Sequence, residues 1–191
     1  TTAFRITCIE DLVEFSKNYT KYNKGYIKLE RTLDFKSIFS YRDYTSKEYG
    51  DLNGDGDVDD IRTELTKQGE NCAGFPTISQ LNAEGTFDGQ NNKICNLYQN
   101  SEKNHAGLFY MSYGTIKNLG LKNINITVKG NQTDMWGYTG ALASVTFGDN
   151  KIKNCYVEGK IIIKAINTSY VGVLVGRNDS GMENCYTVGT L

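Results

Sequence analysis

The residues with the clearest potential for chemistry form an acidic loop, 51-DLNGDGDVDDIR-62. Calcium takes six to eight hard oxygen ligands, and alternating Asp and Asn side chains on a tight loop supply them. The spacing matches most positions of a twelve-residue calcium loop, including a glycine, Gly56, at the sharp turn. The predicted calcium ligands are Asp51, Asn53, Asp55, Asp57 through its backbone carbonyl, and Asp59.

The loop departs from the calcium pattern at its twelfth position, where Arg62 replaces the bidentate glutamate. Asp60 or Glu64 is expected to supply the closing oxygen instead. Loss of the closing charge predicts weak affinity, which suits an extracellular setting with millimolar calcium. The alternative is an acidic, solvated insertion, which does not account for the regular spacing. The sequence therefore predicts a structural Ca²⁺ site rather than a regulatory one.

Composition limits the classes of function. The chain has 191 residues, with 21 basic and 22 acidic side chains, which suits one domain or part of a repeat array. A net charge of -1 and the absence of a basic run argue against a nucleic-acid partner. The longest apolar runs, such as 171-VGVLV-175, are too short to insert into a membrane. The one histidine, His105, argues against zinc hydrolase chemistry.

Internal repeats predict the architecture. Four segments align without gaps, and each has an apolar residue first, asparagine third, and Leu or Cys fourth. They are 94-ICNLY-98, 116-IKNLG-120, 152-IKNCY-156 and 182-MENCY-186. Glycines at 107, 140 and 172 recur after 33 and then 32 residues. Short apolar runs separated by Gly, Asn and Asp indicate strands and turns. A period near 30 residues favours a stacked solenoid.

The recurring asparagines are Asn96, Asn118, Asn154 and Asn184. In a solenoid they are expected to stack at one corner, where their side-chain amides bond from coil to coil. The Leu or Cys that follows each asparagine is expected to point inward. The functional alternative for this column is a ligand-binding row.

The N-terminal segment differs from the repeats. Thr7 and Glu10 have capping-box spacing, and an apolar stripe follows, which predicts a short amphipathic helix over about 9–18. This helix is expected to cap the solenoid. Alternation in 26-YIKLERTLDF-35 indicates the first strands. We expect one module over 1–191, cut from a longer protein: cap and first strands at 1–35, an insertion-rich coil at 36–84, and repeats at 85–191.

Aromatic side chains near predicted turns raise the possibility of a sugar-binding platform. They are Tyr41, Tyr44, Tyr49, Tyr110, Tyr113, Trp136 and Tyr138. Tyrosine also fills the faces and edges of solenoids, so the alternative is a purely structural role. Parallel β-solenoids include polysaccharide lyases and hydrolases, but the sequence has no distinctive acid–base cluster.

The repeats resemble GLUG-type repeats of bacterial surface proteins, which combine a Gly-Leu-Val-Gly element, an Ile-x-Asn-Cys-Tyr element and Gly-x-Val. The segment 171-VGVLVGRNDSGMENCYTVG-189 fits well, and 139-TGALASVTFGDNKIKNCYVEG-159 fits less closely. The segment 85-GTFDGQNNKICNLY-98 is similar to the opening that precedes such repeats. The resemblance implies an all-β, right-handed parallel β-solenoid on an exported protein, outside the cell or on the bacterial surface. It carries over no catalytic residues.

Two functions from different classes follow as expectations. The first is a non-catalytic repeat module, in adhesion or as a rigid spacer, with a host glycan or protein as its ligand. The second is the accessory or substrate-binding part of a secreted enzyme that acts on polysaccharide or host protein, because similar repeats lie beside some immunoglobulin A protease domains. In both, further domains of the same protein are expected, and catalysis within this chain is not.

Overall fold

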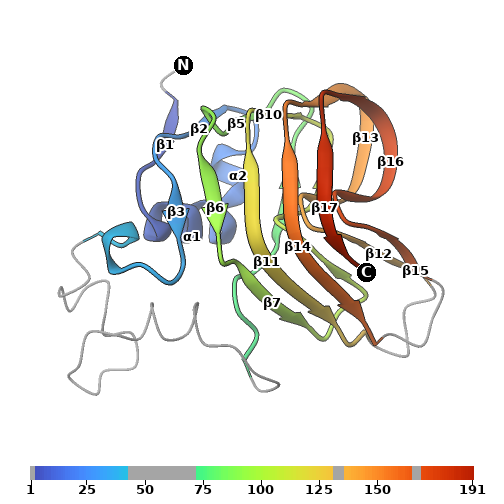
Figure 1. The fold of residues 1–191 in the computed structure, drawn as a ribbon. Helices are drawn as coiled ribbons and strands as arrows, with labels where there is room; N and C mark the ends of the chain where they lie inside the picture. The colour runs from blue at the N-terminus through green and yellow to red at the C-terminus, as the bar shows by residue number, and fades with distance from the viewer. Residues whose placement is uncertain (1–2, 43–71, 131–135, 165–168) are drawn as a thin grey trace.

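The computed structural model describes residues 3–42, 72–130, 136–164 and 169–191. These residues form a parallel β-solenoid with two short helices, as Figure 1 shows. All pairings between the named strands are parallel. The predicted all-β parallel solenoid is therefore confirmed.

Three sheets run along the solenoid. The first contains β1 (Phe4–Ile6), β2 (Tyr26–Leu29), β5 (Thr86–Asp88), β10 (Thr115–Lys117), β13 (Ala143–Lys153), β9 (Phe109–Ser112) and β4 (Ile78–Leu81), with β16 (Val175–Glu183) paired to β13. The second contains β3 (Leu33–Asp34), β6 (Lys93–Cys95), β11 (Gly120–Val128), β14 (Tyr156–Ile163) and β17 (Tyr186–Thr190), with β7 (Tyr98–Ser101) paired to β11. The third contains β8 (His105–Ala106), β12 (Gly137–Gly140) and β15 (Ser169–Gly172).

The core consists of apolar side chains stacked in register from coil to coil. In the first sheet Ile27, Phe87, Ile116 and Ile152 are successive partners, and each is at most 1% exposed. Because successive side chains of a strand point to opposite faces, the residues on either side of this column point outward, where polar side chains can lie. The column ends on β16 at Met182, which is 45% exposed.

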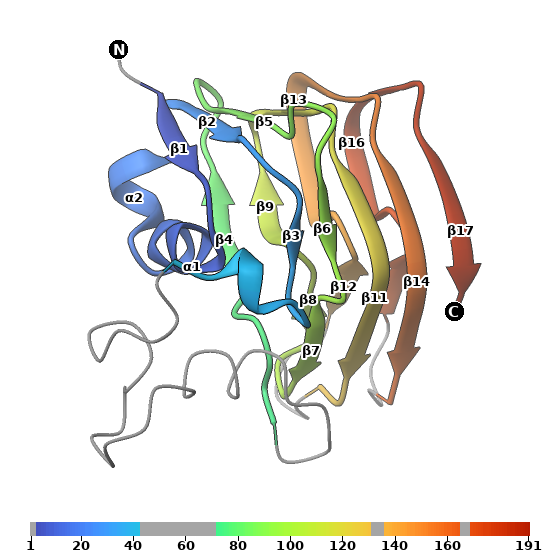
Figure 2. The same cartoon turned by 60° about the vertical axis from the view of Figure 1, so that its left-hand side comes forward.

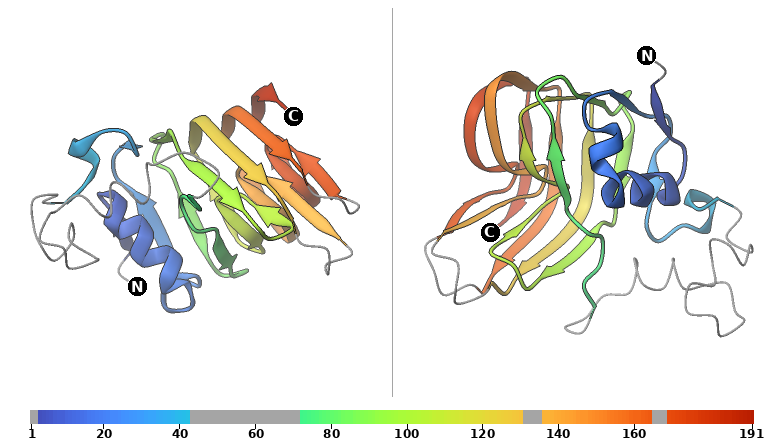
Figure 3. Two further views of the ribbon diagram at one scale, coloured as in Figure 1. Left: turned by 90° about the horizontal axis from the view of Figure 1, so that it is seen from below. Right: turned by 180° about the vertical axis from the view of Figure 1, so that it is seen from behind.

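Two helices cover the N-terminal end of the stack. Figure 2 shows α1 (Ile9–Lys17) and α2 (Tyr19–Tyr22) beside β1 and β4. The buried Phe15 ring of α1 lies against Phe87 and Phe109, with centroids 6.2 and 6.3 Å away. The view from below in Figure 3 shows the helices at one end of the row of strands. The predicted capping helix is confirmed, with its end one residue earlier.

The predicted capping box is wrong in its residues. The N-cap is Cys8, and its side chain makes no capping hydrogen bond. The third residue of the helix, where a capping box has its acidic side chain, is therefore Asp11 and not Glu10. Asp11 accepts hydrogen bonds from the Thr7 amide and hydroxyl at 2.8 and 2.7 Å. Glu10 instead accepts a hydrogen bond from the Arg42 amide. The N-cap lies one residue later than the Thr7–Glu10 spacing indicated, and the acidic residue at the third helical position shifts with it.

The first predicted strands, within 26–35, correspond to β2 and β3. The sequence did not reveal β1, because its three residues are too few to show a period. The expected insertion-rich coil at 36–84 contains the 3₁₀ turn Ile38–Ser40 and β4, and its central part, 43–71, lies outside the described residues.

Candidate functional site

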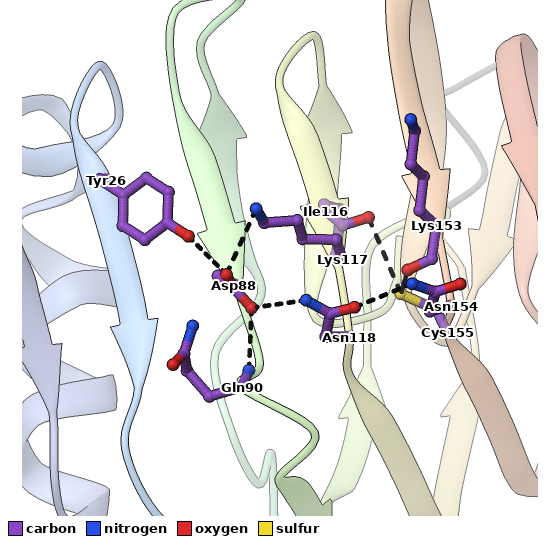
Figure 4. Close-up of polar contacts among 9 residues, drawn as sticks. All are labelled: Tyr26, Asp88, Gln90, Ile116, Lys117, Asn118, Lys153, Asn154 and Cys155. Atoms are coloured by element: carbon purple, nitrogen blue, oxygen red, sulfur yellow. Dashed lines mark hydrogen bonds and ion pairs between the residues drawn. The ribbon is translucent and has the colours of Figure 1, made fainter.

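A hydrogen-bonded row of side-chain amides crosses three coils. Asn184 Nδ2 donates to Asn154 Oδ1 at 3.2 Å, and Asn154 Nδ2 donates to Asn118 Oδ1 at 3.0 Å. Asn118 Nδ2 then donates to Asp88 Oδ1 at 3.0 Å. Figure 4 shows the row from Asp88 to Asn154. We call this row of four side chains the long ladder; its three asparagines confirm the predicted stacking.

The long ladder ends on a buried carboxylate, since Asp88 is only 3% exposed. Asp88 also accepts hydrogen bonds from the Tyr26 hydroxyl and the Gln90 amide, and Lys117 Nζ lies 3.4 Å from its Oδ2 (Figure 4). Burial alone would raise the pKa of Asp88, but these hydrogen bonds and the Lys117 charge together hold it below its ordinary value. Asp88 is therefore an ionised acceptor at neutral pH, which suits anchoring rather than proton donation.

A second row of amides lies at a different corner. Asn123 Nδ2 donates to Asn96 Oδ1, and Asn96 Nδ2 donates to Asp34 Oδ1 at 2.7 Å. We call these three side chains the short ladder. Like the long ladder, it ends on an aspartate from the preceding coil.

The prediction that all four repeated asparagines share one corner is thus wrong for Asn96. Asn118, Asn154 and Asn184 follow strands of the first sheet, whereas Asn96 follows β6 of the second. The spacing held a signal, because Asn96 precedes Asn118 by 22 residues, against 36 and 30 for the later steps. The same local motif arises at both corners because both need the same backbone turn.

That turn explains why the ladder residues are asparagines. The φ angles of Asn96, Asn118, Asn123, Asn154 and Asn184 lie between 51° and 57°. Among non-glycine residues, Asn adopts this left-handed conformation most readily, and its amide also reaches the next coil. The residue after the turn points inward, as predicted: Leu97, Leu119 and Cys155 are at most 1% exposed.

The five cysteines, all within the described residues, are free thiols. Cys8 and Cys155 are buried, and the other three are partly buried. Burial raises the pKa of Cys155 to about 12 and that of Cys8 to about 11, so both remain neutral thiols at pH 7. They act as small apolar core residues rather than nucleophiles.

The candidate sugar-binding aromatics that the structure describes are divided among separate stacking contacts. Tyr110 stacks on His105 at 3.9 Å, and Tyr113 stacks on Phe147 at 5.0 Å. Tyr41 is buried, and Tyr44 and Tyr49 lie outside the described residues. Trp136 and Tyr138 do approach each other through Tyr170, a residue that was not among the predicted aromatics.

These aromatic rings form columns rather than a flat platform. Tyr138 and Tyr170 are register partners, with ring centroids 5.4 Å apart and an interplanar angle of 12°. Tyr156 and Tyr186 stack in the same way, at 5.2 Å and 6°. Stacked rings cover each other's faces, which are the surfaces that bind sugars. The geometry therefore favours a structural role for these rings, in which they hold neighbouring coils of the chain together.

The predicted calcium ligands Asp51, Asn53, Asp55, Asp57 and Asp59 lie outside the described residues, as do the closing candidates Asp60 and Glu64. Elsewhere, the described ranges contain no group of three or more His, Cys, Asp or Glu side chains able to hold a metal. Within the same ranges, no helix has the length and apolar character needed to cross a membrane.

The surface of the described residues includes two hollows. The first, of about 370 Å³, lies between β4, β7 and β8, and its lining includes Thr77, Ser79, Gln99, His105 and Tyr110. Gln99 holds its floor together, donating to the Phe75 and Gly107 carbonyls at 3.0 Å and accepting from the Gly107 amide. The second hollow lies on the second sheet beside the short ladder.

Comparisons with protein-family models, with curated proteins and with solved structures found no match to the chain.

Proposed function

We propose that this chain is a non-catalytic module of an exported bacterial surface protein, with GLUG-type repeats, that acts in adhesion or as a rigid spacer. The observation that supports the proposal most directly is the long ladder, which ties successive coils together outside the apolar core. Stacked tyrosines add a second set of coil-to-coil contacts. A body built in this way resists bending and transmits load along its axis.

The proposal extends to calcium and to location. Ca²⁺ bound by the acidic loop 51–62 serves as a structural ion that fixes the excursion between coils. An extracellular position supplies the millimolar calcium that a site without a closing glutamate needs.

A second function is the substrate-binding part of a secreted enzyme that acts on polysaccharide or host protein. The observation that favours it is the first hollow, whose lining combines the rings of His105 and Tyr110 with the hydroxyl side chains of Thr77 and Ser79. Pockets with an aromatic wall and a few polar groups are typical of small-ligand sites.

An exchange experiment on a displayed protein tests the proposed function. The module is replaced, between a surface anchor and a distal reporter, either by an unrelated solenoid of equal length or by a flexible Gly/Ser linker. Attachment to host material and the distance of the reporter from the surface are measured. If the module is a spacer, the unrelated solenoid restores the reporter distance and the linker does not. If the module is adhesive, neither replacement restores attachment to host material. If the linker preserves both readouts, the proposal is wrong.

A further inference from the structure

The second hollow is a polar cavity of about 380 Å³ on the outer side of the second sheet. Its lining consists of Lys36, Asn123, Ile124, Asn125, Gly159 and Lys160. These residues follow β3 or lie on β11 and β14, three strands of one sheet, so the hollow exists only in the stacked solenoid.

A β-bulge leaves this space open. The register between β11 and β14 shifts between Leu121 and Ile124, so that two residues of β11 face one residue of β14. Beyond the shift, Gly159 faces Ile124 with a φ of 154°. A Cβ at Gly159 would lie 2.3 Å from the Ile124 carbonyl oxygen, so no side chain can fill the gap there. The short ladder also stops at this point.

The rim of the hollow carries two positive charges. Lys36 and Lys160 are both exposed, and within the described part of the chain neither ammonium group forms an ion pair. The Asp34 carboxylate of the short ladder accepts hydrogen bonds from the Lys36 backbone amide and the Asn96 side chain, and it forms no ion pair with either ammonium group. An anion placed between the two groups would meet favourable electrostatics from both sides.

The hollow also contains hydrogen-bond acceptors that lack donors. The Asn125 side-chain oxygen is buried and has no hydrogen-bond partner. The Asn123 side chain is exposed, and among the described residues no donor reaches its oxygen. An unmade hydrogen bond at a buried acceptor costs free energy, so a buried orphan oxygen needs an explanation. Because this oxygen has almost no accessible surface, the Asn125 side chain must turn towards the hollow before a ligand hydroxyl can supply the missing donor.

We propose that this hollow binds an acidic sugar, with its carboxylate between Lys36 and Lys160 and its hydroxyls donating to the side-chain oxygens of Asn123 and Asn125. A neutral sugar would leave both lysines without a partner, and a simple anion would leave the Asn125 oxygen without a donor. The shared ligand chemistry is a ring carboxylate with neighbouring hydroxyls, as in uronic and sialic acids. The inference rests on the adhesive form of the proposed function, for which it names the ligand class.

Four probes separate these possibilities in a titration of the purified chain followed by amide chemical shifts. Glucuronate and N-acetylneuraminate represent the two sources of the carboxylate, glucose lacks the charge, and acetate lacks the hydroxyls. We expect at least one acidic sugar to shift the amides of Asn123, Asn125 and Gly159 at concentrations where glucose and acetate do not. Equal shifts with acetate, or no shift with either acidic sugar, would overturn the proposal.

Three variants test the named contacts, and a fourth is the control. Lys36→Gln and Lys160→Gln should each weaken binding about tenfold, because each removes a charge-assisted contact. Asn125→Ala should weaken binding without lowering the melting temperature, since the oxygen it removes has no partner. Lys151→Gln, at an exposed lysine on β13 of the first sheet, should leave binding unchanged. Unchanged affinity in both lysine variants would contradict the proposal.

The two proposals can fail separately. Loss of binding here, combined with a displayed protein that an unrelated solenoid fully restores, would remove the sugar site and leave the spacer function in place. If the purified chain binds the sugar but the Gly/Ser linker preserves both attachment and reporter distance, the sugar site stands and the proposed function is wrong.

Discussion

Asp88 is nearly inaccessible to solvent, yet it carries a charge. Its Oδ1 accepts from the Asn118 side chain and the Gln90 amide, while its Oδ2 faces the Tyr26 hydroxyl and the Lys117 ammonium. Every polar neighbour is thus a donor or a cation, and a carboxylate, which only accepts, satisfies them all. An asparagine at this position would turn an amide group towards one of these donors.

Asp88→Asn is therefore expected to lower the free energy of unfolding at pH 7 by about 2 kcal/mol, the range of a lost charge-assisted hydrogen bond in a buried site. The folded-state pKa of Asp88 lies below the ordinary 3.8. Its stabilising effect is therefore complete above about pH 4 and is lost as the pH falls through the lower, folded-state pKa. Urea denaturation of both proteins between pH 2 and pH 7 measures this.

Asp149→Asn is the matched control, because Asp149 is an exposed aspartate on β13. It should change stability little at any pH. If the difference between the native chain and Asp88→Asn stayed constant down to pH 2, the ionised state of Asp88 would not be its cause.

At the scale of elements, the corner after each strand has two separate requirements. The backbone must turn through a left-handed residue, and the side chain must bridge two coils. Asn154 meets both, with a φ of 51° and hydrogen bonds to Asn118 and Asn184. Glycine meets only the first requirement, and alanine meets neither.

The pair Asn154→Gly and Asn154→Ala separates the two contributions. Glycine should lose only the exposed amide hydrogen bonds, at a cost of about 1 kcal/mol. Alanine should cost about 1 kcal/mol more, because it must also adopt the left-handed conformation. At Lys151 of β13, which does not have a positive φ, the order should reverse, with alanine more stable than glycine. Equal denaturation midpoints for the two Asn154 variants would show that the turn imposes no strain.

These elements differ in how far the sequence predicts them. The solenoid follows from the repeat, because each coil carries its own strand and turn pattern. The corner of Asn96 does not, because the motif around it is the one used at the other corner. The second hollow could not be predicted, since it depends on which outer residues of distant segments become neighbours. Lys36 and Lys160, for example, are 124 residues apart in the chain.

For the whole molecule, the helices close one end of the stack, and β16 and β17 form its other end. The view from behind in Figure 3 shows α1 and α2 at the end opposite β16 and β17. All five residues of β17 are exposed, including Tyr186 and Val188. The core is therefore best protected at the N-terminal end and in the middle of the stack, and local opening is expected to begin at β17.

Calcium is expected to stabilise the whole chain if the acidic loop binds it. A dissociation constant of about 10⁻⁴ to 10⁻³ M, typical of extracellular sites, predicts about 1.4–2.7 kcal/mol of stabilisation at 10 mM calcium. For a chain of this length that corresponds to a melting temperature higher by roughly 3–10 °C. Differential scanning calorimetry with calcium, with magnesium and with a chelator measures the effect.

Asp51→Ala and Asp55→Ala should remove this calcium response, while Asp149→Ala should keep it. Identical melting temperatures in calcium and in chelator, together with no heat of binding at millimolar calcium, would eliminate the metal site.

The long ladder also has a direction. All three amides donate towards the N-terminal end, and Asn118 and Asn154 also accept from the C-terminal side. The side-chain dipoles therefore add along the axis, as peptide dipoles do in a helix. The carboxylate of Asp88 lies at the positive end of this row, where acidic side chains lie at helix N-termini. An asparagine both donates and accepts, so a coil that carries it can be duplicated or exchanged with another such coil along the ladder. The coil that carries Asp88 can lie only at the N-terminal end of the ladder, because a carboxylate accepts but does not donate.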